Sequence, residues 1–277
     1  MTAPHVGHIN FINCLPLTYS LNKDGFNGLD IHADVPAVLN NDIVNGRLDV
    51  SPVSSIVYAR NNEKLKILPN VSIMADGIVQ SIILVSRKPI DKLTDDKIIL
   101  TAKSATSHCL LKIVLNKAYG AKPNYYIRIT DMNKIVPDDA TAALLIGDDA
   151  LYVNHHREKG LYYYDIGYEW KKLTGLCMVY AIWVVNSDFA AKQPELLQLV
   201  YDRITRGFRN GYKNKDLAIK MVIDKKPFSY KQLDEYLEVI KWRFDVEQQT
   251  ALLKFYELAH DMNLIDHVPG LDMAEVY

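Results

Sequence analysis

The sequence predicts an α/β protein built from two lobes, with two interdomain crossings of the chain and a central cleft. Strand-like and helical segments alternate along the chain, which is the pattern of an α/β fold. Two long apolar runs, residues 79–86 and 178–185, are placed so that the chain can leave one lobe and return to it. The 277 residues are enough for two modest domains. We therefore expect residues 1–86 plus 183–277 to form lobe 1 and residues 87–182 to form lobe 2, with a hinge that closes the cleft.

Lobe 1 is expected to begin with alternating strands and helices. Asn13 and Pro36 mark two helix starts, because asparagine caps helices and proline fits the first helical turn. The expected elements are strand 6–11, helix 14–21, strand 30–35, helix 36–45, strand 48–50 and helix 54–59. The last strand passes through Ser51 and Pro52 and turns directly into its helix.

Lobe 2 is expected to repeat this alternation. Its start is placed after residue 86, because Pro89 and a polar sequence interrupt the apolar run. The expected elements are strand 97–101, helix 107–117, strand 125–129, strand 142–146 and a half-buried strand at 162–164. The strand at 178–185 returns the chain to lobe 1. The remaining residues are helical in pattern, with Pro194 in a first turn and Ser229 as an N-cap.

Composition and charge exclude several classes of protein. Lys and Arg total 32 against 33 Asp and Glu, so the net charge of −1 predicts no broad surface for nucleic acid or an anionic membrane. No stretch approaches the ~18 apolar residues of a membrane-spanning helix. The first residues lack a secretory signal pattern, so we expect a cytoplasmic protein. The cysteines Cys14, Cys109 and Cys177 lack disulfide or metal-ligand spacing and fit a reducing compartment.

Common catalytic and cofactor motifs are missing from the sequence. It has no GxGxxG after a strand and no GxxxxGK(S/T), HExxH or GxSxG segment. Dinucleotide redox chemistry, nucleotide hydrolysis, zinc peptidase chemistry and serine hydrolysis are therefore not expected. The adjacent His155 and His156 are interpreted as solvent-facing, and no metal and no cofactor are expected.

Polar residues at the ends of predicted strands are the candidate binding residues of lobe 1. Asn13 follows the first strand, and its amide offers donors and an acceptor to the crevice where open α/β sheets bind ligands. Ser54 and Ser55 stand at a helix start, where hydroxyls and free backbone N–H groups make a small anion site. Helix capping explains each of these residues equally well.

Two further sets of candidates lie in lobe 2. Ser104, Thr106 and Ser107 would converge with unpaired N–H groups at a helix start, as a carboxylate ligand requires. Asp148 and Asp149 follow an apolar strand and would face the cleft as hydrogen-bond acceptors or a base. A first-turn acidic pair that favours the helix dipole is the commoner interpretation.

Six short segments stand in a characteristic order along the chain. They are VGHINFINCLPL at 6–17, LDVSPVSS at 48–55, SIILVS at 81–86, ATS at 105–107, LIGDDAL at 145–151 and WKKLTG at 170–175. Together they resemble the chorismate dehydratase family of the futalosine route to menaquinone, over about residues 5–260. The resemblance implies a type II periplasmic-binding-protein-like fold. It also implies an enzyme that converts chorismate to 3-[(1-carboxyvinyl)oxy]benzoate and water without a cofactor.

With a dicarboxylate substrate such as chorismate, the candidate residues take specific roles. Thr106 and Ser107 are expected to hold one carboxylate. Three serines are expected to hold the rest of the dianion, namely Ser54, Ser55 and Ser81. Asn13 is expected to orient the reacting edge of the ring or to bind the leaving hydroxyl.

The base and the cation of this reaction stay open at the level of the sequence. An amide cannot act as the base, which is either Asp148 or the substrate's own enolpyruvyl carboxylate. Leu15 stands where the resembled family has an arginine beside its proline, so the cation that would neutralise the substrate is not identified. The candidates are Lys103, Arg87 and Arg128, and His8 and His108 lie near the expected cleft.

Three other functions fit the same pattern. The sister enzyme of the same route, 1,4-dihydroxy-6-naphthoate synthase, shares the fold. A non-catalytic solute-binding protein for a small carboxylate is the commonest use of the fold, but such proteins are exported. A ligand-sensing domain of a regulator would be accompanied by a DNA-binding segment. The sequence does not give the oligomeric state.

Overall fold

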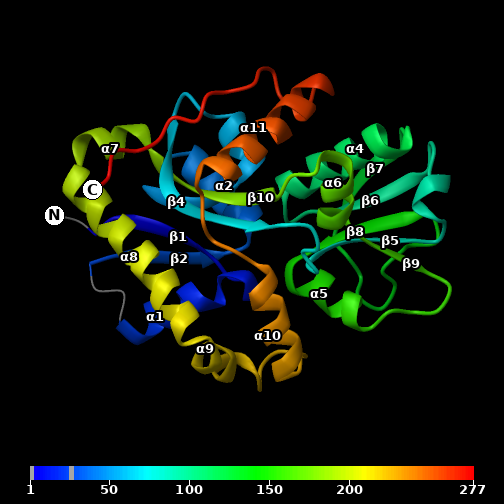
Figure 1. Cartoon of the computed structure of the whole chain (residues 1–277), viewed down its shortest axis with the longest axis horizontal. Coiled ribbons are helices and arrows are strands. Elements are labelled where there is room, and N and C mark those ends of the chain that lie inside the picture. The colour runs from blue at the N-terminus through cyan, green and yellow to red at the C-terminus, as the bar shows by residue number, and fades with distance from the viewer. Residues whose placement is uncertain (1–2, 25–27) are drawn as a thin grey trace.

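The structure, a computed structural model, describes residues 3–24 and 28–277 and contains two lobes, each with its own five-stranded sheet (Figure 1). In Figure 1 lobe 1 lies on the left, and lobe 2, which is mostly green, lies on the right. The predicted two-lobed α/β architecture is therefore confirmed.

The sheet of lobe 1 has the strand order β2-β1-β3-β10-β4. Its strands are β1 (His5–Ile9), β2 (Asp30–Asp34), β3 (Val50–Ser54), β4 (Leu65–Ala75) and β10 (Met178–Asn186). β1 runs parallel to both β2 and β3, whereas β10 runs antiparallel to β3 and β4. The parallel strands therefore end on the same side, facing lobe 2.

The sheet of lobe 2 has the order β7-β6-β8-β5-β9. Its strands are β5 (Ile82–Ser86), β6 (Lys97–Thr101), β7 (Asn124–Arg128), β8 (Ala142–Ile146) and β9 (Tyr162–Asp165). β6 is parallel to β7 and β8, and β5 is antiparallel to β8 and β9. Strands β5 and β8 are fully buried, as expected for sheets covered on both faces.

Helices cover the faces of both sheets. In lobe 1 they are the 3₁₀ turn η1 (Ile12–Cys14), α1 (Leu15–Asp24), α2 (Pro36–Val44), α3 (Ser55–Ala59), α7 (Ser187–Lys192), α8 (Pro194–Lys213), α9 (Lys215–Val222), α10 (Tyr230–Val239) and α11 (Val246–Asp261). In lobe 2 they are the 3₁₀ turn η2 (Ile90–Lys92), α4 (Ala105–Tyr119), α5 (Gly147–His155) and α6 (Ile166–Thr174). Among the residues that the structure describes, no helix has both the length and the apolar character needed to cross a membrane.

The two crossings between the lobes lie at other residues than the sequence suggests. β5 pairs with β8 and β9, so the first crossing is the segment 76–81 that precedes it. β10 lies wholly in the first sheet, so the second crossing is at residues 175–177. The expected boundaries, after residues 86 and 182, are therefore corrected. Pro89 starts a 3₁₀ turn inside lobe 2 instead of marking a crossing.

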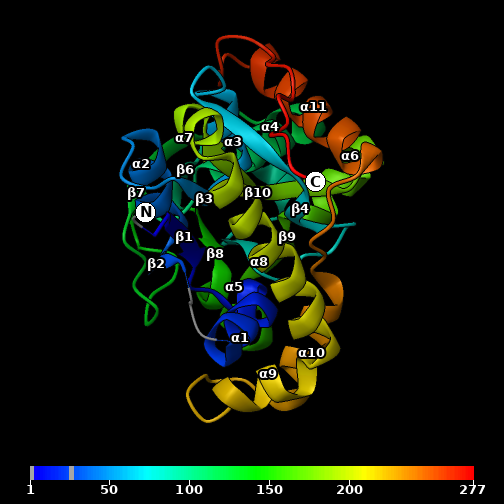
Figure 2. The same cartoon turned by 90° about the vertical axis from the view of Figure 1, so that its left-hand side faces the viewer.

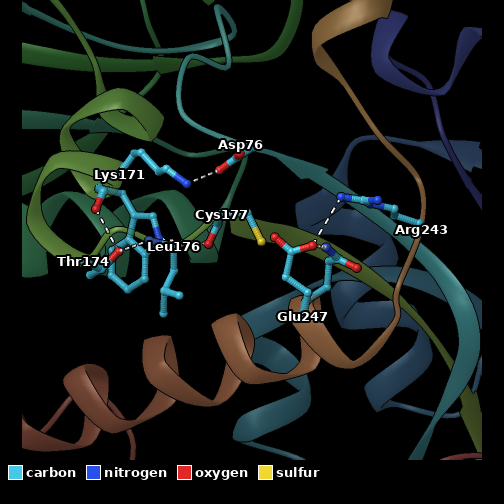
Figure 3. Close-up of polar contacts among 9 residues, drawn as sticks. Asp76, Lys171, Thr174, Leu176, Cys177, Arg243 and Glu247 are labelled. Atoms are coloured by element: carbon cyan, nitrogen blue, oxygen red, sulfur yellow. Dashed lines mark hydrogen bonds and ion pairs between the residues drawn. The ribbon is translucent and has the colours of Figure 1, made fainter.

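Helix α6 ties the two crossings together at the hinge. Lys171 Nζ donates to Asp76 Oδ1 at 2.6 Å and so joins α6 to the first crossing (Figure 3). Trp170 Nε1 donates to the carbonyl oxygen of Cys177 at 3.0 Å and joins the same helix to the second crossing. Figure 3 also shows the pair formed by Arg243 and Glu247 at the start of α11. Helix α6 of lobe 2 is therefore bonded to both segments that join the lobes.

Asp165 fixes the first crossing to lobe 2. Its carboxylate accepts hydrogen bonds from the backbone N–H groups of Val79, at 3.0 Å, and Gln80, at 2.6 Å. It also caps α6 by accepting from Tyr168 N. Burial raises the pKa of Asp165, and these N–H donors oppose that shift. Gln80 has a φ of 64°, a left-handed conformation that is unfavourable for residues other than glycine. The hydrogen bond from Gln80 N to Asp165 holds the chain in this conformation.

Helices α1 and α8 of lobe 1 lie side by side and pack directly against each other (Figures 1 and 2). Gly207 and Gly211 are the buried glycines of α8 at this contact. A Cβ atom on Gly211 would lie 1.8 Å from the carbonyl oxygen of Pro16, and one on Gly207 would lie 2.6 Å from Leu17 Cδ1. The two helix backbones can approach this closely only because position 211 carries no side chain.

Candidate active site

A cavity lies between the lobes, at the carboxyl ends of the parallel strands. A cleft between two domains is a common place for a small-molecule site. Its polar lining consists of Asn13, Ser54, Ser81, Ser104, Ser107 and Tyr180. Among the described residues, no Lys, Arg, His, Asp or Glu lines it. A charged ligand in this cavity would therefore be stabilised by neutral donors and helix ends.

Asn13 lies in the 3₁₀ turn η1 and points an unsatisfied oxygen into this buried region. Its Oδ1 atom is buried and has no hydrogen-bond partner among the described residues. A buried polar atom without a partner costs about 1–3 kcal/mol. The side chain caps neither η1 nor any other described helix, so the capping interpretation is not supported. Asn13 is instead available to a ligand.

Tyr180 provides a second unsatisfied polar atom in the same cavity. It lies in β10, and its hydroxyl is buried with no partner in the described part of the chain. Burial raises the pKa of Tyr180, so the hydroxyl stays protonated and can donate a hydrogen bond to a ligand. The sequence did not single out this residue, because it lies in a continuous apolar run that reads as core.

Two serine hydroxyls are oriented by neighbours outside the cavity. Tyr236 OH donates to Ser81 Oγ at 2.9 Å, and Asn40 Nδ2 donates to Ser54 Oγ at 3.2 Å. Burial raises the pKa of Tyr236, which keeps that donor protonated. Each serine oxygen already accepts a hydrogen bond, so its own hydrogen is left to point elsewhere. The Ser81 hydroxyl makes only a long contact of 3.4 Å with the carbonyl of Val79.

The start of α4 brings two more hydroxyls to the cavity. Ser104 is the N-cap and accepts from Ser107 N at 3.4 Å, and the two hydroxyl oxygens are 3.2 Å apart. The N-terminus of this helix favours negative charge. Of the expected carboxylate site, Ser107 lies in the cavity lining and Thr106 does not.

Ser55 and Thr106 meet at a contact between the lobes instead of lining the cavity. Thr106 Oγ1 accepts from Ile56 N at 3.2 Å and lies 3.3 Å from Ser55 Oγ. Ser55 Oγ donates to the carbonyl of Val179 at 2.9 Å, so the hydrogen between the two hydroxyls comes from Thr106. Both hydroxyl hydrogens are therefore used within the protein, and neither residue belongs to the cavity lining.

Asp148 also bridges the lobes from outside the cavity lining. Its Oδ1 accepts from Ile12 N at 3.1 Å, and its Oδ2 accepts from Lys226 Nζ at 2.6 Å. The residue before it, Gly147, does line the cavity, at a φ of 62°. A Cβ on Gly147 would lie 3.0 Å from the ring of Phe11, so glycine allows the lobes to approach here. The position of Asp148 suits a closing contact better than a base.

The positive groups considered from the sequence have partners elsewhere. Lys103 pairs with Asp149, Arg87 donates to the carbonyl of Val136, and Arg128 pairs with Asp139. Burial lowers the pKa of His8 to about 4, so its ring is neutral, and its Nε2 lies 2.7 Å from Thr18 Oγ1. His108 Nε2 bonds to the carbonyl of Thr101 at 2.6 Å.

The arrangement suits a small anion that carries a hydroxyl group. Hydroxyl donors from Ser54, Ser81 and Tyr180, with the start of α4, can surround carboxylate oxygens. Asn13 Oδ1 is the buried acceptor that a ligand hydroxyl can satisfy. Such preformed donors also stabilise negative charge that grows during a reaction.

Comparisons with known proteins identify a family and relatives. The family model described as menaquinone biosynthesis matches residues 4–261. A chorismate dehydratase of Thermus thermophilus is 37% identical over 149 residues, which are 53% of this chain and 52% of that protein. The chain thus matches about half the length of this relative. A chorismate dehydratase of Campylobacter jejuni is 26% identical over 265 residues, covering 93% of this chain and 98% of that protein.

Solved structures share the fold at low sequence identity. A protein of Archaeoglobus fulgidus has a TM-score of 0.79 at 18% identity, covering 95% of this chain and 98% of that one. The periplasmic aliphatic sulphonate binding protein of Escherichia coli has a TM-score of 0.67 at 14% identity, covering 98% of this chain and 91% of that one. These likenesses show the fold alone, and the expected periplasmic-binding-protein-like fold is confirmed.

Proposed function

The chain belongs to the menaquinone biosynthesis family, and from this premise we propose that it is a chorismate dehydratase. The enzyme is a hydro-lyase that removes water from chorismate to give 3-[(1-carboxyvinyl)oxy]benzoate. The names of both curated relatives support this activity. No cofactor takes part in the proposed reaction.

The observation that carries the proposal is a cavity with neutral donors and one unpartnered buried acceptor. Chorismate has two carboxylates and one ring hydroxyl. Ser54, Ser81 and Tyr180 can donate to carboxylate oxygens, and the start of α4 adds a favourable field. Asn13 Oδ1 can accept the hydrogen of the ring hydroxyl, which would satisfy its missing bond. Donors and acceptor thus match the ligand in kind.

The chemistry needs stabilisation of negative charge more than it needs a strong catalytic group. The hydrogen on C3 of chorismate is γ to the ring carboxylate through the C1=C2 bond. Its removal delocalises the electron pair into that carboxylate, and expulsion of the C4 hydroxyl then leaves an aromatic ring. Hydroxyl donors around the ring carboxylate lower the barrier because they strengthen as its charge grows.

We assign the base to the substrate's own enolpyruvyl carboxylate. It takes the proton from C3 and passes it to the hydroxide that departs from C4, so water leaves and the carboxylate is restored. This choice is supported by the cavity lining, which includes no carboxylate or imidazole among the described residues. Asn13 positions the C4 hydroxyl during the transfer.

A substitution at Asp148 distinguishes this assignment from the alternative in which the protein supplies the base. Asp148→Asn keeps an oxygen for Ile12 N and removes the charge that pairs with Lys226. We expect kcat to stay within about threefold of wild type and KM to rise several-fold, because closure of the lobes is weakened. Steady-state kinetics with chorismate measures both. A fall of kcat by a thousandfold or more in the folded variant would make Asp148 the base.

Ser55 and Thr106 are assigned to closure of the cleft in the same way. Their hydroxyls link α3 and α4 across the lobes, so they hold the closed state and do not touch substrate.

We also propose a cytoplasmic location. Its support is the three cysteines Cys14, Cys109 and Cys177, which are buried and unpaired.

The direct test is incubation of the purified chain with chorismate. An aromatic product is expected in the ultraviolet spectrum, with a mass lower than that of chorismate by one water. A parallel sample with the cyclic futalosine derivative tests the sister enzyme, 1,4-dihydroxy-6-naphthoate synthase. Binding of chorismate without turnover would instead indicate a solute-binding protein, as in the sulphonate binding protein that shares the fold.

Tyr180→Phe is expected to lower activity while leaving the fold intact or more stable. The variant loses a donor to a charged substrate, which predicts a 10- to 100-fold fall in kcat/KM. It also removes a buried hydroxyl without a partner, so the melting temperature should stay equal or rise.

Tyr58→Phe is the matched control for that substitution. The Tyr58 side chain is also buried, but its hydroxyl donates to the carbonyl of Gly270 at 2.9 Å, and neither residue belongs to the cavity lining. This control should lose stability and keep kcat/KM. Equal effects of the two substitutions on kcat/KM would remove Tyr180 from the proposed site.

A further inference from the structure

Two histidines and an aspartate form a compact cluster at one edge of the lobe 1 sheet. His5 lies on β1, and Asp30 and His32 lie two residues apart on the neighbouring strand β2. His5 and Asp30 are partners in the parallel register, so the alternation of side chains puts all three on one face. His5 Nδ1 lies 2.7 Å and His32 Nε2 lies 3.1 Å from the same oxygen, Asp30 Oδ2.

The cluster has the dimensions of a metal site. The three ligand atoms lie within 4.8 Å of one another. A tetrahedral Zn²⁺ with bonds of about 2.0–2.1 Å to nitrogen and oxygen needs ligand atoms about 3.3 Å apart. Small side-chain rotations, without movement of the strands, therefore make room for the ion.

The ligand types restrict which ion would bind. Two imidazole nitrogens and one carboxylate oxygen suit borderline ions such as Zn²⁺, and they suit the hard ions Mg²⁺ and Ca²⁺ poorly. All three side chains are exposed, so an ion can reach them and water can complete the coordination.

The cluster is separate from the cavity between the lobes. His5 begins β1, whereas Ile9 at the other end of that strand lines the cavity. At about 3.3 Å per residue the two ends of the strand are about 13 Å apart. Sequence spacing gives no hint of the cluster, because 24 positions lie between its first two members and only the parallel pairing of β1 and β2 joins them.

We propose that His5, Asp30 and His32 form a binding site for one Zn²⁺ ion per chain. The site is independent of the proposed dehydratase reaction, and its role is to fasten the edge strand β2 to β1. Metal binding would stabilise the native fold, because the unfolded chain does not hold the three ligands together.

The experiment uses the untagged full chain, since a histidine tag would bind the same ions. Zinc chloride is titrated into the protein by calorimetry, and the melting temperature is measured with and without zinc. We expect one equivalent of Zn²⁺ to bind and the melting temperature to rise. His32→Gln and Asp30→Asn should each weaken binding at least tenfold and abolish the thermal shift.

His267→Gln is the matched control, because His267 is an exposed histidine outside the cluster. It should bind zinc like wild type. Cobalt(II) bound to the wild type should show the visible absorption of a tetrahedral ion, and His32→Gln should not. Absence of zinc binding to the wild type, or equal losses in His267→Gln and His32→Gln, would overturn the proposal. Turnover of chorismate is measured on the same samples and should not change, so the two proposals fail separately.

Discussion

Replacing Asn13 with alanine should lower kcat for chorismate by at least a hundredfold, which corresponds to about 2.7 kcal/mol of transition-state stabilisation. The reason is the position of its side chain. Asn13 lines the cavity, and its Oδ1 is buried without a partner in the described chain, so it is free to accept a hydrogen bond from a ligand. Without this contact the C4 hydroxyl is no longer held beside the carboxylate that protonates it.

Stability distinguishes this effect from simple damage to the fold. The variant removes a buried polar atom that bonds to no described residue, so its melting temperature should match that of wild type within about 2 °C or exceed it. Asn13→Asp is a useful second variant, because it keeps the size of the side chain and adds a negative charge that repels a dianion. It should lose activity and also bind chorismate more weakly. Wild-type turnover by a folded Asn13→Ala protein would contradict the proposed role.

The largest effect on stability is expected from Gly211→Ala. In a helix such as α8 alanine is ordinarily better than glycine by about 1 kcal/mol. Here the added Cβ would lie 1.8 Å from the carbonyl oxygen of Pro16, a backbone atom that cannot rotate away. Helix α8 must therefore separate from α1, and we expect a loss of about 3 kcal/mol or more. Thermal or urea unfolding measures this change.

Gly270→Ala is the matched control for that experiment. A Cβ on Gly270 would meet nothing within 4 Å, so its substitution should change the free energy of unfolding by less than about 0.5 kcal/mol. An unchanged or increased stability of Gly211→Ala would show that α1 and α8 can separate at no cost. It would also contradict the close packing described for these helices.

Much of the fold follows from short apolar runs with clear ends. The sequence predicts β6 and β8 at the observed bounds, Lys97–Thr101 and Ala142–Ile146, because buried strands in a parallel arrangement read as continuous apolar segments. It also places polar residues at the strand ends that face the cleft. Asn13, Ser54 and Ser107 do line the cavity, because the carboxyl ends of parallel strands meet at one edge. Ser81, expected from the family resemblance, also lines it, because it directly precedes β5 and this strand runs antiparallel to β8.

The sequence signal is weakest where tertiary packing decides the outcome. β4 escapes prediction because Pro69 lies inside it and Asn70 has a φ of 62°, and the structure absorbs this break through shifts of register against β10. Asp148 adjoins a residue of the cavity, but successive positions of a helix point in different directions, so it faces Lys226. Tyr180 has one polar atom in an apolar strand, and only the shape of the cavity reveals its use.

The place of β10 between β3 and β4 affects how the protein is made on the ribosome. All strands of lobe 2 lie between residues 82 and 165, so they are synthesised before β10 at residues 178–186. Domains generally fold as units as the nascent chain emerges. Lobe 2 can therefore complete its sheet first, although the chain begins with lobe 1. Until the returning strand is inserted, β3 and β4 keep unpaired edges that would need protection from aggregation during translation.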